Sequence, residues 1–448
     1  MKRHAWLLGA ALALGCGGGK PANPDAGPKP QDDGGTTDTP FVRLTVDTEP
    51  TELHRISSIA MAVGPDDRIG IAYFVKVPGK ELDFELRYRE VKDGQVQANA
   101  ETIRTVQRVY GVSLAFAANG QPAVSYLGGV YDGTSSESIF WFQSDLAVAY
   151  RAANGTWTEQ VAVRRSNEAF ANNSVSDSGN IVGLDPALVF NGNEALVAYR
   201  DVHNGQFPQG DWNASDAELA IGGPTSWQHQ MVALGGDGAD EKPAYGGHLD
   251  MVLAGGQPAL VFDQALNAAD APGQNVYFQR RGSDGKTWTP PRKIQSVGNT
   301  MLGASLAYDP AVGFGIAVVD RSDNKLTYIS CDGKTGTQCT APGDWTLPDP
   351  VYQTGTGGWY PSLAFDPKTH DPSIAFHICS LEPGRNEGGC SPSDDALVIA
   401  TRVEDQWREV TVDTAGGWSP KLAFLSTGQR VVLYRVPTTS VLMLAVER

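Results

Sequence analysis

The stretch SLAFDPKTHDPSIAF, residues 362–376, decides the fold of this chain. It consists of an apolar run, a turn rich in Asp, Pro and His, and a second apolar run, which is the pattern of a β-hairpin. Both runs are almost continuously apolar, which indicates strands buried on both faces. Related hairpins recur seven times, at residues 59–73, 114–126, 188–199, 251–262, 306–318, 363–376 and 422–434.

A third β-rich run follows each hairpin, and most of these runs lead through a polar turn to a strand that begins near a tryptophan. The tryptophans at this position are Trp157, Trp227, Trp288, Trp345 and Trp407. Their recurrence at one place in the repeat predicts a packing role. Four-stranded units of this kind cannot close a core alone but can pack radially. We therefore expect an all-β, seven-bladed β-propeller over residues 41–448.

The two ends of the repeat region predict how the ring closes. The seventh unit stops after its third strand at Arg448. The missing strand has a counterpart at residues 41–48, FVRLTVDT, which match residues 407–414, WREVTVDT, almost position for position. We expect the N-terminal strand to complete the last blade and so to remove an exposed sheet edge. A chance similarity of two short β-rich strings is the alternative.

The first 15 residues predict a signal peptide, because Lys2 and Arg3 precede an apolar run that is too short to span a bilayer. The segment ALGC at residues 13–16 resembles the lipobox of bacterial lipoproteins, although Ala stands where Leu is usual. The resemblance implies a lipid on Cys16, contact with the membrane through that anchor only, and, since Gly17 is not Asp, the outer membrane. An ordinary secreted protein is the alternative. Residues 16–40 contain few large apolar residues and are expected to form a disordered tether.

Composition and charge exclude some partners. The chain has 448 residues and a formal net charge of −16, so it would repel nucleic acid and anionic lipid, which attract clustered Lys and Arg. The 51 Gly and 28 Pro suit short strands joined by turns. We expect a monomeric propeller in the cell envelope whose partner is an envelope protein or a polysaccharide.

Four cysteines remain after Cys16, and they form two pairs that are close in sequence. These pairs are Cys331 with Cys339 and Cys379 with Cys390. An even number of cysteines inside Gly- and Pro-rich loops predicts two local disulfides in an oxidising compartment. A four-cysteine zinc site is the alternative, but no Cys-x-x-Cys spacing supports it.

A functional site is expected on one rim of the ring, where the start of each first strand meets the end of each second strand. Residues at these positions converge on the central channel, and the long loops at 127–145, 200–216 and 377–395 leave the same rim. The candidates for ligand binding there are Arg55, Tyr110, Asp185, Arg200, Asp201, His248, Asp263, Asp320, Trp359, Tyr360, His377 and Arg435.

These candidates also have structural interpretations. Trp359 follows a Gly-Gly pair and can fill the gap between two blades. Arg200 and Asp201 can form an ion pair on the rim without any ligand. His248 and His377 are candidates for acid–base groups or metal ligands, or for hydrogen-bonded fillers.

Three aspartates suggest a metal that their spacing does not support. Asp185, Asp263 and Asp320 could hold Ca²⁺ if they converged, but no Asp-x-Asp-x-Asp loop is present. Residues 366–371, DPKTHD, connect a first and a second strand at the end of the blade opposite the rim, and are expected to form a turn. We expect neither a cofactor nor a metal.

The string SDGKTW at residues 283–288 resembles a degenerate Asp-box, the turn between the third and fourth blade strands of sialidases and related propellers. NGTW at residues 154–157 is a weaker version. In that family the box is structural, so the resemblance implies the fold of residues 41–448 and not an activity. Sialidases usually have six blades, and their Tyr–Glu nucleophile pair and catalytic acid have no counterpart that we can place here.

Two functions remain open. The first is a binding or scaffold lipoprotein that engages a protein or a glycan through its loop-rich rim, because no catalytic motif is present. The alternative is a carbohydrate-active enzyme, a glycosidase or a lyase, that uses some of Asp185, Asp201, Asp263, Asp320 and His377 as acid and base.

Overall fold

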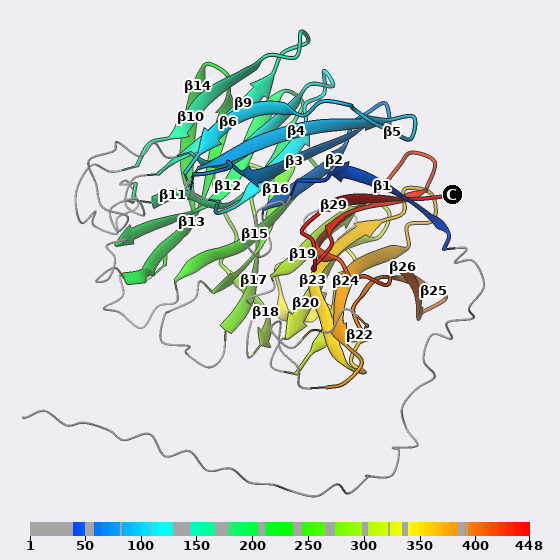
Figure 1. Cartoon of the computed structure of the whole chain (residues 1–448). Helices are drawn as coiled ribbons and strands as arrows, with labels where there is room; N and C mark the ends of the chain where they lie inside the picture. Colours follow the sequence, from blue (N-terminus) through cyan, green and yellow to red (C-terminus); the bar gives the residue numbers. More distant parts are fainter. Residues whose placement is uncertain are drawn as a thin grey trace, which may run out of the picture. The chain divides into compact units, whose positions relative to one another are not determined.

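The repeats form seven antiparallel sheets arranged as the blades of a propeller (Figure 1). The computed structural model describes residues 39–448 except 50–57, 81–82, 108, 129–143, 166–177, 180, 205–210, 236–243, 265–273, 298–302, 321–322, 334–338, 384–389 and 391–392. The expected signal peptide, Cys16 and most of the expected tether lie outside the described residues. Within the described part of the chain, no helix is long and apolar enough to cross a bilayer.

Each blade is built from four main strands, which follow one another in the chain in every blade except the last. The first strands are β2 (Ile59–Val63), β7 (Val112–Phe116), β11 (Ile181–Asn191), β15 (Tyr245–Ala254), β19 (Ala304–Asp309), β23 (Thr356–Phe365) and β27 (Trp418–Phe424). The second strands are β3 (Ile69–Lys76), β8 (Pro122–Gly128), β12 (Glu194–Asn204), β16 (Gln257–Gln264), β20 (Gly313–Asp320), β24 (Pro372–Ser380) and β28 (Arg430–Arg435).

The outer half of each blade completes the sheet. The third strands are β4 (Phe84–Lys92), β9 (Asp145–Arg151), β13 (Asp211–Gly223), β17 (Gln274–Arg280), β21 (Lys325–Cys331), β25 (Ala396–Val403) and β29 (Leu442–Glu447). The outermost strands are β6 (Glu101–Val106), β10 (Trp157–Val163), β14 (Ser226–Ala233), β18 (Arg292–Val297), β22 (Asp349–Tyr352), β26 (Gln406–Asp413) and β1 (Phe41–Asp47). A short β5 (Gln95–Val96) also pairs with β4, and the 3₁₀ helix η1 (Pro342–Asp344) precedes β22.

The N-terminal strand closes the ring, as the sequence predicts. The last sheet has the order β1-β29-β28-β27, and β1 runs antiparallel to β29 with Phe41 opposite Glu447. Phe41 and Val46 are only 2 % and 1 % exposed. Each first strand contacts the first strand of the next blade, and β27 contacts β2. The prediction of seven blades with a shared last blade is therefore confirmed.

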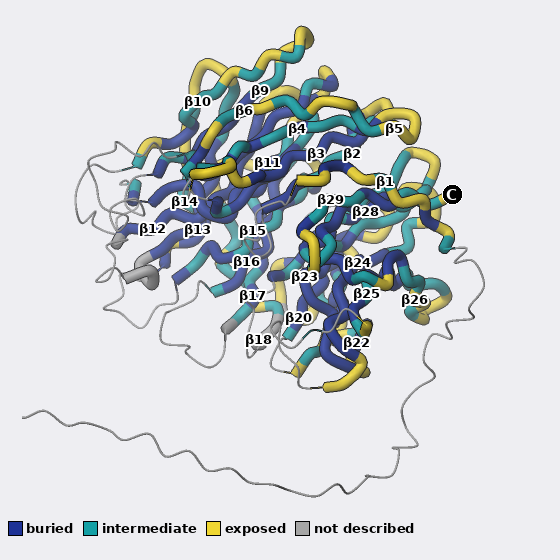
Figure 2. The backbone as a smooth tube through the Cα atoms, viewed as in Figure 1, coloured by how far each residue is buried: buried dark blue, intermediate teal, exposed yellow. Residues whose placement is uncertain are grey.

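Burial decreases from the channel outward. In β3, every residue except Lys76 is buried, whereas β26 is buried only at its last two residues. Figure 2 shows this change along the blades. The apolar side chains of adjacent blades pack together, for example Ile71 of β3 with Leu433 of β28. The second strands are thus covered on both faces, in agreement with their continuous apolar sequence.

The recurring tryptophans pack against the preceding blade. Trp157 contacts Tyr88 edge to face with ring centroids 5.1 Å apart, and its indole N–H donates to Glu101 at 2.8 Å. Trp407 repeats both contacts, with Tyr328 at 5.5 Å and Asp349 at 3.1 Å. The packing interpretation of this position is confirmed for these residues.

Two of the five tryptophans do not begin a strand. After Trp288, strand β18 begins only at Arg292, and after Trp345, β22 begins only at Asp349. Prolines separate each tryptophan from its strand, at 290–291 and at 348. Proline has no backbone N–H to donate to the neighbouring strand, so pairing starts later.

A buried aspartate at the end of an outermost strand joins one blade to the next. Asp413 of β26 accepts a hydrogen bond from the hydroxyl of Tyr434 at 2.6 Å and forms an ion pair with Arg43 at 2.9 Å. Asp47 of β1 accepts the same bond from Tyr73, also at 2.6 Å. These two aspartates are the Asp of the matching VDT segments. The sequence similarity therefore reflects a shared contact between blades.

We expect Tyr434→Phe to lower the free energy of unfolding by about 1–2 kcal/mol, because it leaves the buried Asp413 carboxylate without one of its donors. Tyr150→Phe is the matched control, since the Tyr150 hydroxyl is buried and has no hydrogen-bond partner among the described residues. Denaturant unfolding monitored by tryptophan fluorescence measures both. Equal losses for the two variants would show that the bond does not stabilise the junction.

The two predicted disulfides are present, Cys331–Cys339 and Cys379–Cys390. The turn at residues 366–371 also has the expected role. The Asp366 carboxylate accepts the backbone N–H of Lys368 at 2.7 Å, and the backbone N–H of His370 bonds to the Asp366 carbonyl. These residues shape a turn at the end of the blade opposite the expected rim.

Candidate functional site at the channel mouth

Four blades have a bulge at the entrance of the first strand, and in two of them the bulged residue, Asp185 or His248, lines the channel. The pairing of first and second strands shifts by one residue after Leu184, Gly247, Trp359 and Trp418. The residue in the bulge has a positive φ in each case, namely Asp185, His248, Tyr360 and Ser419. Bulges of this kind redirect a side chain, and they tolerate the proline that follows in three of the four blades.

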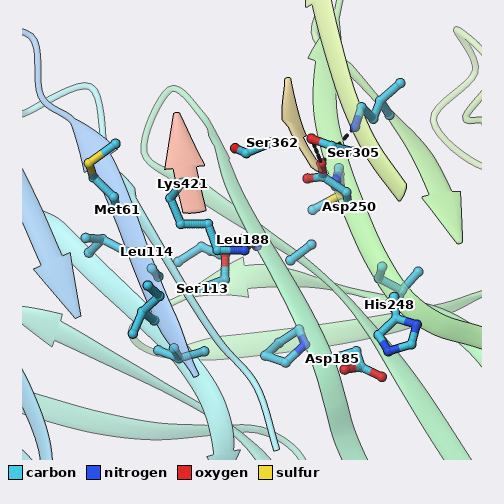
Figure 3. Close-up of a pocket in the computed structure, with 18 of the residues that line it drawn as sticks. Met61, Ser113, Leu114, Asp185, Leu188, His248, Asp250, Ser305, Ser362 and Lys421 are labelled. Atoms are coloured by element: carbon cyan, nitrogen blue, oxygen red, sulfur yellow. Dashed lines mark hydrogen bonds between the residues drawn. The ribbon is translucent and has the colours of Figure 1, made fainter. Parts of the chain in front are cut away.

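The bulges open on a cavity of about 270 Å³ that is lined by the first strands of all seven blades. Figure 3 shows Asp185 and His248 together at one end of the lining, while Lys421 and Ser362 lie farther along it. Leucines such as Leu114 and Leu188 fill much of the wall between them. The cavity is the central channel, and Asp185 and His248 lie at its mouth.

A histidine and two aspartates meet at this mouth, between the third and fourth blades. His248 Nδ1 lies 2.7 Å from Asp263 Oδ2. Burial lowers the pKa of His248, but the charges of Asp263 and Asp185 raise it further than burial lowers it, so the net shift is upward. Arg200 opposes this rise. The imidazole is therefore held near carboxylates that favour its protonated form.

Arg200 is fixed beside this group by polar contacts with its own blade. It is 5 % exposed, and its Nε donates to Ser215 Oγ at 3.1 Å. The Ser215 hydroxyl donates in turn to the Tyr245 carbonyl at 2.9 Å. Gly246, at φ +93°, permits this approach, because a Cβ there would lie 3.1 Å from the Arg200 Cβ.

Four inter-blade hydrogen bonds between first strands lie deeper in the channel. The Ser113 hydroxyl accepts the backbone N–H of Leu188 in the next blade at 2.9 Å. Three further bonds of the same kind join later blades. Asp250 accepts the backbone N–H of Leu306 (2.8 Å), Ser305 accepts that of Leu363 (3.0 Å), and Ser362 accepts that of Leu422 (2.9 Å). These polar side chains join adjacent blades. Their hydrogen bonds to backbone N–H groups reduce what they can offer to a ligand.

Lys421 occupies the position of these side chains in the seventh blade, and its ammonium group cannot accept such a bond. Its ammonium group has no hydrogen bond or ion pair with another described residue. Burial lowers the pKa of Lys421, Asp250 raises it, and Arg435 lowers it. The channel thus contains a cation at a position where three other blades have serine. Sequence reasoning missed it, although SPKL at 419–422 aligned with YPSL at 360–363 marks the exchange.

The structure does not bring all predicted rim residues to the mouth. Trp359 is fully buried, and its indole N–H donates to Asn324 at 3.2 Å, which supports the packing interpretation. His377 is also fully buried, and Arg435 is 1 % exposed with Nη2 donating to Ser419 at 3.3 Å. Tyr360 is 4 % exposed in the bulge of its blade.

The other candidates differ in position. Asp320 ends β20 in the fifth blade, and Tyr110 accepts the Asp185 backbone N–H at 3.3 Å through its carbonyl. Arg55 lies outside the described residues. Asp201 is 0 % exposed, and its carboxylate accepts the backbone N–H of Gly179 at 2.9 Å. Asp201 therefore lies within a blade, away from the channel mouth.

Asp201 belongs to a buried polar cluster that sequence reasoning did not identify. Asp216 lies opposite Asp201 on β13, and His203 Nε2 is 3.0 Å from the Asp216 carboxylate. Glu218 accepts a hydrogen bond from the Tyr199 hydroxyl. Burial and the charge of Glu218 raise the pKa of Asp201. Alternating polar residues on two paired strands, at 199–203 and 216–218, were the available signal.

Comparisons with known proteins add likenesses of fold. No protein-family model matches the chain, and no curated protein matches it. An α-L-arabinanase of Penicillium chrysogenum in complex with arabinobiose has a TM-score of 0.47 and 11 % identity over 90 % of this chain and 97 % of its own. A variant of the NanB sialidase from Streptococcus pneumoniae has a TM-score of 0.45 and 11 % identity over 91 % and 70 %.

A third solved structure is similar at the same level. The α-L-arabinofuranosidase of Fusarium graminearum in complex with arabinobiose has a TM-score of 0.46 and 12 % identity over 80 % of this chain and 98 % of its own. None of these values is high enough to transfer an activity to this chain.

Proposed function

We propose that this protein is a carbohydrate-active enzyme, a glycosidase or a lyase, that binds a saccharide at the channel mouth. The observation that carries the proposal is the His248 imidazole, bonded to Asp263 at 2.7 Å and influenced by Asp185. An imidazole between carboxylates can donate and accept protons near neutral pH, which both reactions need. Of the two functions that the sequence left open, this proposal prefers the carbohydrate-active enzyme to a purely binding role.

The shape and lining of the channel support a sugar ligand. The cavity of about 270 Å³ is slightly below the ~300–1,000 Å³ of common ligand pockets, so it suits one end of a saccharide. Two partly exposed aromatic residues offer faces for stacking: Tyr110, whose carbonyl accepts the Asp185 backbone N–H, and Trp418, which adjoins the bulge of the seventh blade. Lys421 would stabilise negative charge on a ligand or on a reaction intermediate.

Saccharide binding without turnover is the second candidate. It is favoured by the inter-blade hydrogen bonds of the channel, because Asp250, Ser305 and Ser362 already accept backbone N–H groups. Fewer polar groups are then free to act on a substrate. The two candidates share one ligand class and differ in whether product forms.

We place the protein in the cell envelope. A lipid on Cys16 and a Pro- and Gly-rich tether over residues 16–40 would display the propeller away from the membrane. The two disulfides agree with an oxidising compartment. Mass spectrometry of the mature N-terminus tests the anchor, since an unmodified terminus would contradict it.

Turnover is tested with the full chain on a panel of aryl glycosides and plant and animal polysaccharides. Reducing-end assays detect hydrolysis, and absorbance of unsaturated products detects elimination. We expect product from at least one class and a loss of about 10²-fold or more in His248→Gln. His370→Gln is the matched control, because His370 also pairs with an aspartate, Asp309 at 2.9 Å, but at the opposite end of a blade.

The possible outcomes separate the two candidates. Binding of a saccharide without product, lost in His248→Gln, would replace catalysis by recognition. Neither binding nor product from the panel would contradict the saccharide proposal. Equal losses in the two histidine variants would show that the channel mouth is not the site.

A further inference from the structure

The disulfide Cys379–Cys390 in the sixth blade lies beside two further metal-binding side chains. A ring nitrogen of His377, the sulfur of Cys390 and a carboxylate oxygen of Asp395 all lie within 4.8 Å of one another. Cys379 is bonded to Cys390 and follows His377 by two residues on β24, so both side chains emerge from the same face of the strand. Four side chains of the types that bind Zn²⁺ therefore converge at one place.

The polar groups at this place are incompletely satisfied. Asp395 is 4 % exposed, and its Oδ1 is buried with no hydrogen-bond partner among the described residues. At His377, the backbone N–H of Gly417 points at Nδ1 (3.2 Å) and the indole N–H of Trp418 points at Nε2 (3.3 Å). A neutral imidazole has only one acceptor nitrogen, so one of these two donors is unmatched. Buried polar atoms without partners need an explanation, and a cation bound after the disulfide opens is one.

We propose that opening the Cys379–Cys390 disulfide creates a site for a thiophilic divalent cation such as Zn²⁺, bound by Cys379, Cys390, His377 and Asp395. The S–S bond accepts two electrons and two protons from a dithiol reductant, which becomes a disulfide itself. The two thiols release those protons when their sulfurs bind the cation as thiolates. In the oxidised protein the sulfurs are bonded to each other, so the disulfide and the metal site exclude one another.

The second disulfide lacks these neighbours and serves as an internal control. Cys339 is fully buried in an apolar cluster with Phe314 and Ile316, and its carbonyl accepts the indole N–H of Trp345 at 3.3 Å. Within the described part of the chain, neither Cys331 nor Cys339 belongs to a set of three or more His, Cys, Asp or Glu side chains that could hold one ion. Reduction alone would therefore expose two thiols there without building a complete site.

The experiment uses the full chain, oxidised or reduced with dithiothreitol and then freed of reductant without air. Co²⁺ is the probe, because thiolate ligation gives a charge-transfer band and tetrahedral geometry gives strong visible bands. We expect both bands in the reduced protein, in its Cys331→Ser/Cys339→Ser variant, and not in the oxidised protein. Asp395→Asn should weaken Zn²⁺ binding, read by a chromogenic chelator, by about 10-fold or more.

Several results would overturn the proposal. They are absence of cobalt bands in the reduced protein, equal bands in a Cys379→Ser/Cys390→Ser variant, and unchanged Zn²⁺ affinity in Asp395→Asn. A second measurement needs no variant: Zn²⁺ should slow iodoacetamide labelling of Cys379 and Cys390, identified by peptide mass, while labelling of Cys331 and Cys339 continues. Labelling of all four at the same rate with and without Zn²⁺ would also contradict the site.

Discussion

Deleting residues 41–48 is expected to lower the free energy of unfolding by about 5 kcal/mol or more, which is enough to unfold many domains. The deletion removes Phe41 and Val46 from the core of the junctions on either side of the last blade. It also leaves the Tyr73 hydroxyl without its bond to Asp47 and exposes the edge of β29. Circular dichroism on heating measures the loss.

A matched deletion and a rescue make this test specific. Removing residues 21–28, within the expected tether, should leave the melting temperature unchanged. Phe41 lies opposite Glu447 in the antiparallel pair, so the same eight residues attached after Arg448 through an Asn-Gly turn can re-enter the blade as a hairpin. We expect this permuted chain to regain most of the lost stability. An unchanged melting temperature in the original deletion would contradict closure by β1.

The fold could be predicted from the sequence because its signals are local and repeated. Each blade has the same short hairpin pattern, so an error at one repeat is corrected by the other six. The closure followed from one match, between residues 41–48 and 407–414. The Asp that the two segments share accepts a hydrogen bond from a tyrosine hydroxyl in both places. The delayed starts of β18 and β22 were missed because the tryptophan was given more weight than the prolines after it.

The site was predicted less well because a side chain's direction depends on bulges that the sequence shows only indirectly. Asp185 and His248 were among the candidates, and the bulges do turn them into the channel. Trp359 was also a candidate, but its side chain packs between blades. Lys421 was overlooked because a single lysine in an apolar strand is usually at a surface, whereas the ring geometry places this one in the channel.

Replacing Asp263 by Asn is expected to reduce turnover at the channel mouth by about 10²-fold and to move its pH profile to lower pH. Asp263 and Asp185 raise the pKa of His248 while burial lowers it. Without the Asp263 charge, the pKa of His248 falls. An acid and a base at this position would both then titrate at lower pH, so the direction of the shift does not depend on the role of the imidazole.

The same substitution has a consequence for stability that needs no substrate. A histidine whose pKa is raised by folding stabilises the protein below its ordinary pKa of about 6.5, and this contribution is lost as the pH rises through the folded value. The stability difference between the natural protein and Asp263→Asn should therefore be largest below about pH 6.5 and decrease at higher pH. Denaturant unfolding across this range measures it, and NMR titration of the imidazole reports the pKa directly.

Asp309→Asn, which removes the partner of His370, should leave turnover unchanged. A His248 pKa that does not move in Asp263→Asn would mean that the 2.7 Å contact does not control this proton, and the acid–base role would then lose its physical basis.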